Sequence, residues 1–264
     1  MYDFIYQRPD SVSQAVDLLA ADEMAMPIAG GMTLLPTLKL RMAQATQLVD
    51  LAGIDELNGV AGDADSLSIG AMTPHADVAD HPLVRDKLPA LAKLAGGIGD
   101  PQVRNRGTIG GSLANNDPAA DYPAAVLGLD AVVVTNRREI PADDYFLGMF
   151  TTALEPGEVI VRVRFSPALR AAYAKFRNPA SGYAVVGVFV AETGAGVRVA
   201  VTGAGGCVFR HTAMEAALSG SFSPDAITGI ETPADELNAD LHASAEYRAH
   251  LVGVMAAEAV AAAG

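Results

Sequence analysis

Two pairs of adjacent glycines constrain this sequence more than any other feature. Gly30-Gly31 follows the apolar segment Pro27-Ile28-Ala29, and Gly110-Gly111 lies within the glycine-rich stretch from Gly96 to Ser112. Adjacent glycines adopt backbone angles that are closed to other residues and let the chain approach a ligand closely. The sequence has 26 glycines and no tryptophan, so the places where glycines cluster carry most of the information.

The N-terminal segment alternates between strand and helix patterns. Apolar residues recur at helical spacing from Val12 to Leu19, and Asp10 or Ser11 is expected to cap that helix. The other elements expected here are a buried strand ending at 27–29, a second helix over 34–40 and a strand at 48–51. This alternation predicts a small α/β unit.

After Gly59 the pattern changes to a mixture of strands and helices. Residues 78–95 are expected to be mostly helical, with interruptions at Pro82 and Pro89. Further strands are expected at 67–69, 131–135, 159–165, 184–191 and 197–202, and further helices at 124–129, 212–218 and 245–263. Ser166-Pro167 is the expected boundary of the last part. The sequence therefore predicts an α+β fold in three parts, at residues 1–57, 58–166 and 167–264.

Composition narrows the class of protein. Half of the residues are hydrophobic and 19% are charged, which is typical of a well-packed protein. The net charge of −13 argues against broad contact with nucleic acid or an anionic membrane. The longest apolar stretch, residues 183–191, is too short to span a bilayer, and the N-terminus lacks the pattern of a signal peptide. Cys207 is the only cysteine, which excludes an internal disulfide and a cysteine-ligated cluster. We expect a cytoplasmic protein.

The first glycine pair has the chemistry of a phosphate site. Ala29-Gly30-Gly31-Met32-Thr33 stands between an apolar strand and a helical pattern. A helix that begins just after the glycines leaves several N–H groups unpaired, and phosphate binds well at such a place. A tight strand-to-helix turn without a ligand is the alternative, and the glycine pair alone favours that alternative.

The second glycine pair lies among hydroxyl and amide side chains. The stretch from Gly107 to Ser112 continues through Asn115 and Asn116, whose side chains bond to phosphate or ribose oxygens in suitable geometry. Asp117-Pro118 is typical of a helix cap followed by a first helical residue. Asp121, one turn further on, is expected to accept bonds from ribose hydroxyls or an adenine amine, or else to cap the helix before Pro123. Two such loops are expected to hold both ends of an extended, phosphate-bearing cofactor.

Other side chains offer weaker candidates. None of the five histidines stands at metal-ligand spacing from another, so no metal site is expected. We expect His75 to be exposed in a loop, and Cys207 to be a small buried residue. Arg104 and Arg106 flank the second loop, where they are expected either to offset phosphate charge or to lie in an interface or in solvent. The acidic run Asp63-Ala64-Asp65 is typical of a turn.

Long stretches of the chain resemble a known family. AGGMTLLPTLKLR (29–41) and IGDPQVRNRGTIGGSLANNDPAADYPAAVLGLDA (98–131) are similar to the two FAD motifs in the medium subunits of molybdenum hydroxylases, the xanthine oxidase and carbon monoxide dehydrogenase family. The similarity extends to FIYQRPDSVSQAVDLLA near the start and to GAGGCVFRHTAMEAAL and ASAEYRAHLVGVMAAEAV near the end. It therefore covers nearly the whole chain.

The resemblance implies an FAD held by a two-part N-terminal domain, with an α+β domain behind it. It places Ile160 near the cofactor through its backbone, Lys175 through its side chain and Asp121 toward the adenosine side. Met32 stands where many members carry histidine or glutamine. The FAD-binding residues implied are Ala29, Gly30, Gly31, Met32, Thr33, Leu34, Thr108, Ile109, Gly110, Gly111, Ser112, Asn115, Asp117, Asp121, Ile160 and Lys175.

The resemblance also implies partners. The FAD would take electrons from [2Fe-2S] clusters on a small iron–sulfur subunit and pass them to an external acceptor. The molybdenum cofactor would lie on a large subunit that binds molybdopterin, in a dimer of heterotrimers. No residue of this chain is then expected to act directly on the organic substrate. A stand-alone FAD-dependent oxidoreductase and a non-catalytic nucleotide-binding module are the alternatives. The sequence leaves open the substrate and the acceptor, which could be NAD, quinone or dioxygen.

Overall fold

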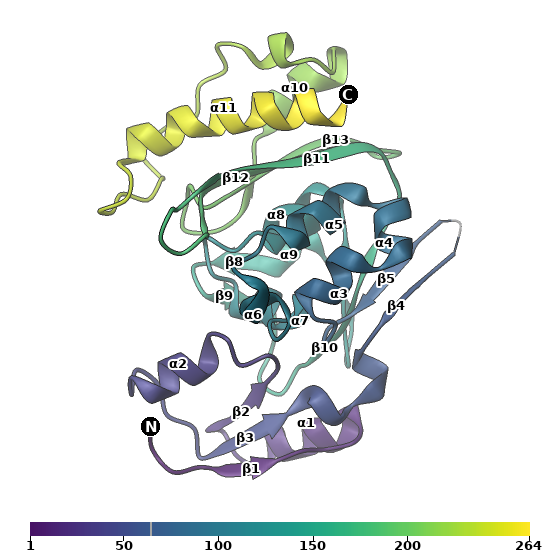
Figure 1. Ribbon diagram of the computed structural model, residues 1–264, viewed down its shortest axis with the longest axis vertical. Helices are drawn as coiled ribbons and strands as arrows, with labels where there is room; N and C mark the ends of the chain where they lie inside the picture. The colour runs from purple at the N-terminus through teal and green to yellow at the C-terminus, as the bar shows by residue number, and fades with distance from the viewer. Residues whose placement is uncertain (64) are drawn as a thin grey trace.

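Three main β-sheets follow one another along the chain, as the computed structural model shows (Figure 1). It describes residues 1–63 and 65–264, so Ala64, in the turn predicted at Asp63-Ala64-Asp65, lies outside the described residues. Each of the segments 1–57, 58–166 and 167–264 contains one of these sheets. The α+β fold class is confirmed, and the boundaries themselves stay a prediction.

The first unit is the α/β unit that the sequence predicts. Its three strands are parallel, and α1 and α2 make the crossovers that parallel strands require. Ser11 caps α1, because its side chain accepts a hydrogen bond from the N–H of Gln14. The elements are β1 (Ile5–Gln7), α1 (Val12–Ala20), β2 (Ala25–Ile28), α2 (Leu34–Lys39) and β3 (Gln47–Asp50), with sheet order β1-β3-β2.

The second unit is an antiparallel sheet covered by short helices. The predicted helical segment 78–95 is divided at both prolines, because proline removes a backbone donor and fits best at the first position of a helix. The sheet has the order β4-β5-β10-β6-β7. The strands are β4 (Val60–Gly62), β5 (Leu67–Gly70), β6 (Val132–Thr135), β7 (Glu139–Pro141) and β10 (Ile160–Phe165). The helices are α3 (His75–Asp80), α4 (Pro82–Lys87), α5 (Pro89–Gly96), α6 (Pro101–Arg104), α7 (Ile109–Asn115), α8 (Tyr122–Gly128) and α9 (Ala142–Tyr145).

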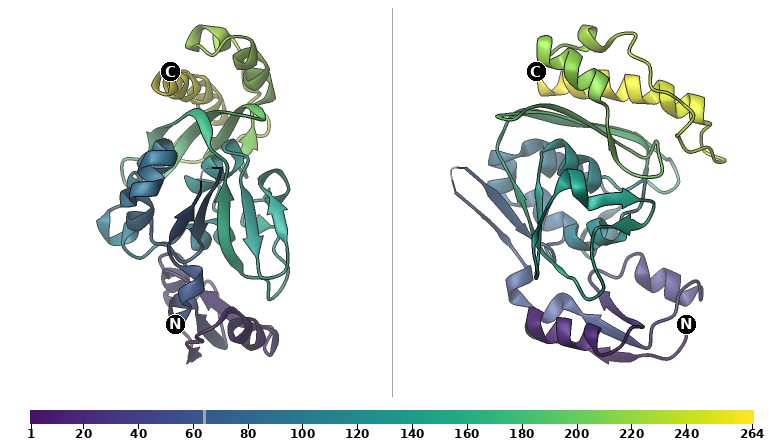
Figure 2. Two further views of the ribbon diagram at one scale, coloured as in Figure 1. Left: turned by 90° about the vertical axis from the view of Figure 1, so that its right-hand side faces the viewer. Right: turned by 180° about the vertical axis from the view of Figure 1, so that it is seen from behind.

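The third unit places a sheet between helix α11 and the second unit (Figures 1 and 2). Side chains alternate along β12, so Val186, Val188 and Val190 join the core under α11, whereas Phe189 and Ala191 join the core of the second unit. The strands are β11 (Ala168–Arg177), β12 (Ala184–Thr193), β13 (Gly196–Thr202) and β14 (Phe209–Arg210), in that order. The helices are α10 (Thr212–Gly220) and α11 (Ala245–Ala263).

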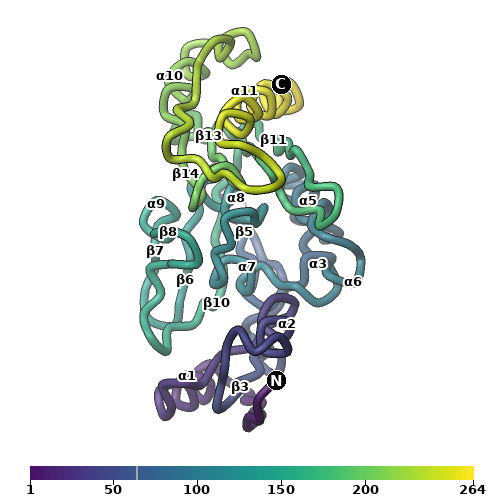
Figure 3. Tube along the Cα trace, turned by 90° about the vertical axis from the view of Figure 1, so that its left-hand side faces the viewer, coloured from purple at the N-terminus to yellow at the C-terminus, as the bar shows by residue number. Residues whose placement is uncertain are grey.

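The sequence did not predict β11, the hairpin of β8 (Phe146–Gly148) and β9 (Thr151–Thr152), or the short strands β4, β7 and β14. Strand β11 mixes alanines with long polar side chains and contains no β-branched residue. Met72 and Val159 of the second unit complete a core with Ala15 and Val49 of the first. The two units are therefore packed together, while the chain termini lie at opposite ends of the molecule (Figures 2 and 3).

Candidate cofactor site

A cavity of about 420 Å³ lies where the three units meet. Helix α2 of the first unit stands beside α6 and α7 of the second at this place (Figures 1 and 3). The turn between β11 and β12 contributes Ser181, Gly182 and Tyr183 from the third unit. The cavity has the size of typical cofactor and small-molecule sites. Of the residues predicted to bind a cofactor, it is lined by Ala29, Gly30, Gly31, Met32, Thr33, Leu34, Thr108, Gly110, Gly111, Ser112, Asn115, Asp117, Asp121 and Ile160.

The two glycine loops lie directly against each other. A Cβ atom added to Gly30 would stand 1.9 Å from the carbonyl oxygen of Arg106, and one added to Gly111 would stand 3.3 Å from Cβ of Ala29. The expectation that the loops hold opposite ends of a ligand is therefore wrong. They form one continuous wall at the middle of the cavity.

The first loop presents free backbone donors to the cavity. Gly31 has φ +72°, a conformation that favours glycine, and its carbonyl accepts the N–H of Leu35 to begin α2. No residue in the described part of the chain accepts a hydrogen bond from the N–H groups of residues 30–34. Donors left unpaired at the start of a helix attract anions, because partial positive charge lies behind them.

The second loop uses its N–H groups internally. The N–H of Gly110 donates to the Ala71 carbonyl at 2.8 Å, and that of Gly111 donates to Oγ1 of Thr108 at 3.1 Å. A Cβ atom on Gly110 would meet Cβ of Ala71 at 2.5 Å, so this glycine is required by packing. Ile109 is fully buried behind the wall. What the second loop offers a ligand is its side chains, Ser112 and Asn115 among them.

Asp117 does not begin a helix, contrary to the sequence expectation. Asn116 ends α7 in the left-handed conformation, at φ +44°, and the carboxylate of Asp117 accepts the N–H of Ala119 in a turn. Helix α8 begins only at Tyr122, with Pro123 in its first turn. The turn nevertheless leaves Asp117 at the cavity wall.

Asp121 is the partner of a buried lysine. Its carboxylate accepts hydrogen bonds from the Tyr173 hydroxyl at 2.5 Å and from Nζ of Lys175 at 3.0 Å. Lys175 also donates to the carbonyls of Gly97 and Gly182, and so lies behind the cavity wall rather than in it. Burial raises the pKa of Asp121, and the Lys175 ammonium opposes that rise. Each carboxylate oxygen thus accepts one of these hydrogen bonds, and Asp121 still lines the cavity, so its role as a ribose or adenine acceptor stays a prediction.

His75 is buried, so the expectation of an exposed loop histidine is wrong. It begins α3, is 5% exposed and borders the cavity. Burial, and secondarily the charge of Arg104, lower the pKa of His75 to about 4. Its ring centroid lies 5.2 Å from that of Tyr122. Within the described structure, His75 Nδ1 and the Tyr122 hydroxyl have no hydrogen-bond partner. The imidazole is therefore neutral at pH 7.

Comparison with known families decides what kind of site this is. The family described as the FAD binding domain in molybdopterin dehydrogenase matches residues 2–168. The chain belongs to this family. The match covers the first unit, the second unit and the first residue of β11, which together contain both glycine loops.

Relatives of this FAD-binding family are similar over almost their full length. The carbon monoxide dehydrogenase medium chain of Hydrogenophaga pseudoflava is 37% identical over 98% of this chain and 96% of its own. The nicotine 6-hydroxylase medium subunit of Paenarthrobacter nicotinovorans is 38% identical over 94% of this chain and 92% of its own. A structure of the Hydrogenophaga pseudoflava carbon monoxide dehydrogenase that lacks the Mo-pyranopterin moiety matches with a TM-score of 0.90 and 38% identity, over 99% of this chain and 97% of that one.

The cavity has the properties that a molybdopterin dehydrogenase FAD-binding domain requires. Free N–H groups line one wall and can hold a diphosphate, and the apolar side chains around them suit an aromatic ring system. Within residues 1–63 and 65–264, no group of three His, Cys, Asp or Glu side chains could hold a metal ion. No helix in the described part of the chain is long and apolar enough to cross a membrane.

Several lining residues were missed at the level of sequence. Three of them lie in or beside α6, namely Ile98, Gly99 and Val103. This segment is part of the second motif (98–131), so the motif could have indicated that they line the site. Leu154 and Glu158 come from the segment before β10. The lining residues 181–183 come from a turn of the third unit that was not predicted, although Asn178-Pro179 and Ser181-Gly182 are typical turn dipeptides. No local pattern indicates that this turn reaches the cavity.

Proposed function

We propose that this chain is the FAD-carrying electron-transfer subunit of a multi-subunit molybdenum hydroxylase. Membership of the FAD-binding family, and relatives named as medium chains or medium subunits along nearly their whole length, support this proposal over a stand-alone oxidoreductase or a nucleotide-binding module. The observation that carries it is that the N–H groups of residues 30–34, which line a cavity shared by all three units, have no acceptor among the described residues.

FAD, when bound, supplies the redox chemistry, and the protein binds and orients it. The N–H groups of residues 30–34 would hold the diphosphate. The side chains of Ser112 and Asn115 would contact polar groups of the cofactor from the second loop. The Asp121–Lys175 pair would fix the walls around Gly97 and Gly182, because Lys175 donates to both carbonyls.

The proposed complex has two kinds of partner. Electrons would arrive from [2Fe-2S] clusters on a small subunit, and a large subunit would carry the molybdenum cofactor, in a cytoplasmic dimer of heterotrimers. The acceptor would be NAD, quinone or dioxygen. The native mass of the complex purified from its host tests the stoichiometry, and its substrate profile identifies the compound that is hydroxylated.

The cofactor proposal is tested by releasing the chromophore. The purified chain should hold one FAD, and acid or heat denaturation should leave all of the flavin in the supernatant, because we expect no covalent link. Chromatography of the released flavin distinguishes FAD from FMN. FMN, or a flavin that stays with the precipitate, would contradict the proposal, and so would a chain that takes up no flavin at all.

The docking face is proposed to lie near the second loop. Arg104 is a poor probe of it, because its guanidinium donates to the carbonyls of Ile98 and Gly99 at 2.9 and 3.1 Å and so supports the cavity wall. Arg106 has an exposed side chain and is the better probe. Arg106→Glu should slow assembly with the iron–sulfur subunit, most strongly at low salt, whereas Lys93→Glu, a charge reversal at an exposed side chain of α5, should not. Equal assembly rates for the two variants would remove Arg106 from the interface.

A further inference from the structure

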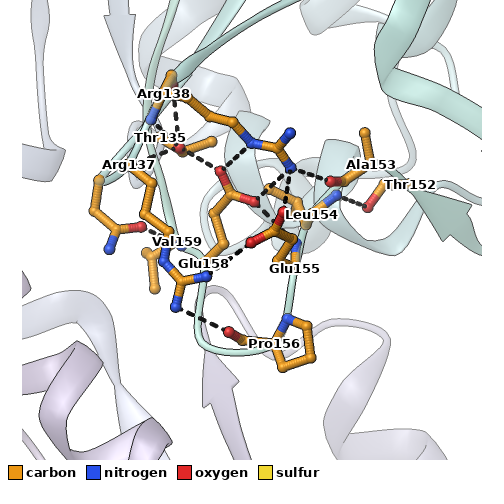
Figure 4. A network of polar contacts seen from close by, with 11 residues as sticks. Thr135, Arg137, Arg138, Thr152, Ala153, Leu154, Glu155, Pro156, Glu158 and Val159 are labelled. Atoms are coloured by element: carbon orange, nitrogen blue, oxygen red, sulfur yellow. Dashed lines mark hydrogen bonds and ion pairs between the residues drawn. The ribbon is translucent and has the colours of Figure 1, made fainter.

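A polar cluster fastens the segment before β10 to the turn between β6 and β7 (Figure 4). We call Thr135, Arg138 and Glu158 the Glu158 clamp. Arg138 donates from Nε to Oε1 of Glu158 and from Nη2 to Oε2, both at 3.0 Å. The Thr135 hydroxyl donates to Oε1 at 2.7 Å. The N–H of Glu155 donates to Oε2 at 2.9 Å, so the carboxylate also joins the two ends of the turn 155–158.

The carboxylate at the centre of the clamp is buried and charged. The side chain of Glu158 has no exposed surface, whereas that of Arg138 is 43% exposed. The hydrogen bonds from Arg138 hold the pKa of the Glu158 carboxyl at about 2, against the opposing effect of burial. A buried carboxylate is stable only when its oxygens are paired in this way. The Glu158 carboxylate therefore joins Thr135 and Arg138 to the N–H of Glu155 through one buried group.

Further contacts from the same turn reinforce the clamp. Arg138 Nη2 also donates to the Ala153 carbonyl at 2.6 Å, and Arg137 donates to the Pro156 carbonyl at 3.0 Å. Asn136 pairs with Val159 in both directions, since it accepts the Val159 N–H on Oδ1 at 2.8 Å and donates its own N–H to the Val159 carbonyl at 3.0 Å. The whole of 153–159 is thus held from one side.

The fastened segment is a wall of the cavity. Leu154, Glu158, Val159 and Ile160 all line it. The strand that follows has a register shift between Ile160 and Arg162, and the Val161 carbonyl between them accepts the N–H of Ala71 at 3.0 Å. The Ala71 carbonyl in turn accepts the N–H of Gly110. Two hydrogen bonds through Ala71 therefore connect Val161, the residue after this wall, to the second glycine loop.

We propose that Glu158 and Arg138 are positioning residues for the cofactor, which hold the wall 154–160 at the place where bound FAD contacts it. The inference rests on the proposed function, because it concerns the same cavity. A group that only stabilised the fold would change the free energy of unfolding and leave the affinity of the folded chain for FAD unchanged. A positioning group changes that affinity, because a displaced wall loses contacts with the ligand.

The sequence provides a matched control. Arg164 and Glu139 form a similar two-point pair, at 2.8 and 2.6 Å, on the same sheet. Neither is among the lining residues in the described structure. Glu139→Gln therefore removes a carboxylate from a two-point arginine pair without touching the cavity wall, although the Glu139 side chain is 55% exposed.

The experiment titrates FAD into flavin-free wild type, Glu158→Gln and Glu139→Gln, and follows flavin fluorescence. Urea unfolding of the same flavin-free proteins reports stability separately. Glu158→Gln should raise the Kd for FAD at least about tenfold in the folded fraction and shift the visible flavin spectrum, whereas Glu139→Gln should stay within about twofold of wild type. Arg138→Lys keeps the charge but loses the two-point geometry, so its Kd for FAD should lie between those of the two glutamate variants. It replaces Glu158→Gln as the test if Glu158→Gln does not fold.

The outcomes separate the two claims. A Kd for Glu158→Gln equal to wild type, with or without lower stability, would overturn the positioning role and leave the FAD assignment intact. An equal loss of FAD affinity in Glu139→Gln would also overturn the positioning role, since removal of any negative charge would then explain the loss. A wild-type chain that binds no FAD would overturn the proposed function and this inference with it.

Discussion

Replacing Gly30 with alanine tests whether contact between the two glycine loops sets cofactor affinity. Gly30 does not have a positive φ, so the backbone conformation itself accepts alanine. The new methyl group would nevertheless stand 1.9 Å from the Arg106 carbonyl oxygen and 2.8 Å from Cα of Gly107. Both are backbone atoms, so no side chain can rotate away. The loops must separate by about 1.5 Å to restore ordinary contact.

That displacement should weaken FAD binding more than it weakens folding. Overpacking of this kind costs roughly 1–3 kcal/mol of stability. Hydrogen bonds to charged groups contribute about 1.5–3 kcal/mol each, so losing two of the donors at residues 30–34 would cost about 3 kcal/mol or more. At about 1.4 kcal/mol for each factor of ten, we expect the Kd for FAD to rise about 100-fold or more.

The assay is isothermal titration of FAD into the flavin-free protein, with the folded fraction measured by circular dichroism. Gly220→Ala is the control, because no described atom outside its chain neighbours and the backbone of α10 lies within 4 Å of its added Cβ. Gly31→Val and Gly110→Val are less decisive, since the positive φ of Gly31 and the contact of Gly110 with Ala71 make folding itself sensitive. Affinity within twofold of wild type for Gly30→Ala would refute the reasoning.

Three further predictions concern stability, each measured by urea unfolding of the flavin-free chain. Asp121→Asn should destabilise the fold by about 3 kcal/mol, because it leaves the Lys175 ammonium buried without its carboxylate; a cycle with Lys175→Met that proved additive would contradict this. The folded pKa of His75 is about 4, below its unfolded value, so the unfolded chain takes up the proton first as pH falls below about 6.5. Wild type should therefore lose about 2 kcal/mol more than His75→Phe between pH 7 and pH 5, and parallel pH profiles would show that the imidazole is not responsible. Gly253→Ala, inside α11, should stabilise by up to about 1 kcal/mol, because no described atom outside its chain neighbours and the backbone of its own helix lies within 4 Å of the new Cβ; a lower free energy of unfolding would show a contact that the structure does not predict.

Elements that depend on local signals were predicted well. The prolines that divide 78–95 and the alternation in the first unit gave the right elements, because capping and periodicity act over a few residues. The range 245–263 of α11 was predicted without error. The first glycine loop lies between β2 and α2, as the sequence pattern predicts, and its role in binding phosphate stays a prediction.

Features that depend on distant neighbours were not predictable. Strand β11 has little strand character of its own and is fixed by pairing with β12 along nearly its whole length. The environment of Asp121 is set by Tyr173 and Lys175, which belong to that strand. Contact between the two glycine loops depends on how the first and second units pack. The sequence also does not show that the second loop donates its N–H groups to other residues while those of the first loop stay without an acceptor in the described structure.

The junction of three units at the cavity has a consequence for the empty protein. The first unit contributes only small cores of its own, one of them formed by Ile28, Leu38, Ala45 and Leu48. Segments with small cores open locally at lower free energy than the rest of a protein. A ligand present at 100 times its Kd raises the free energy of any opening that disrupts its site, and the increase is about 2.7 kcal/mol. Loading of the cofactor would then act as a maturation step, after which β2 and the 178–183 turn exchange their amide hydrogens slowly and resist proteases together.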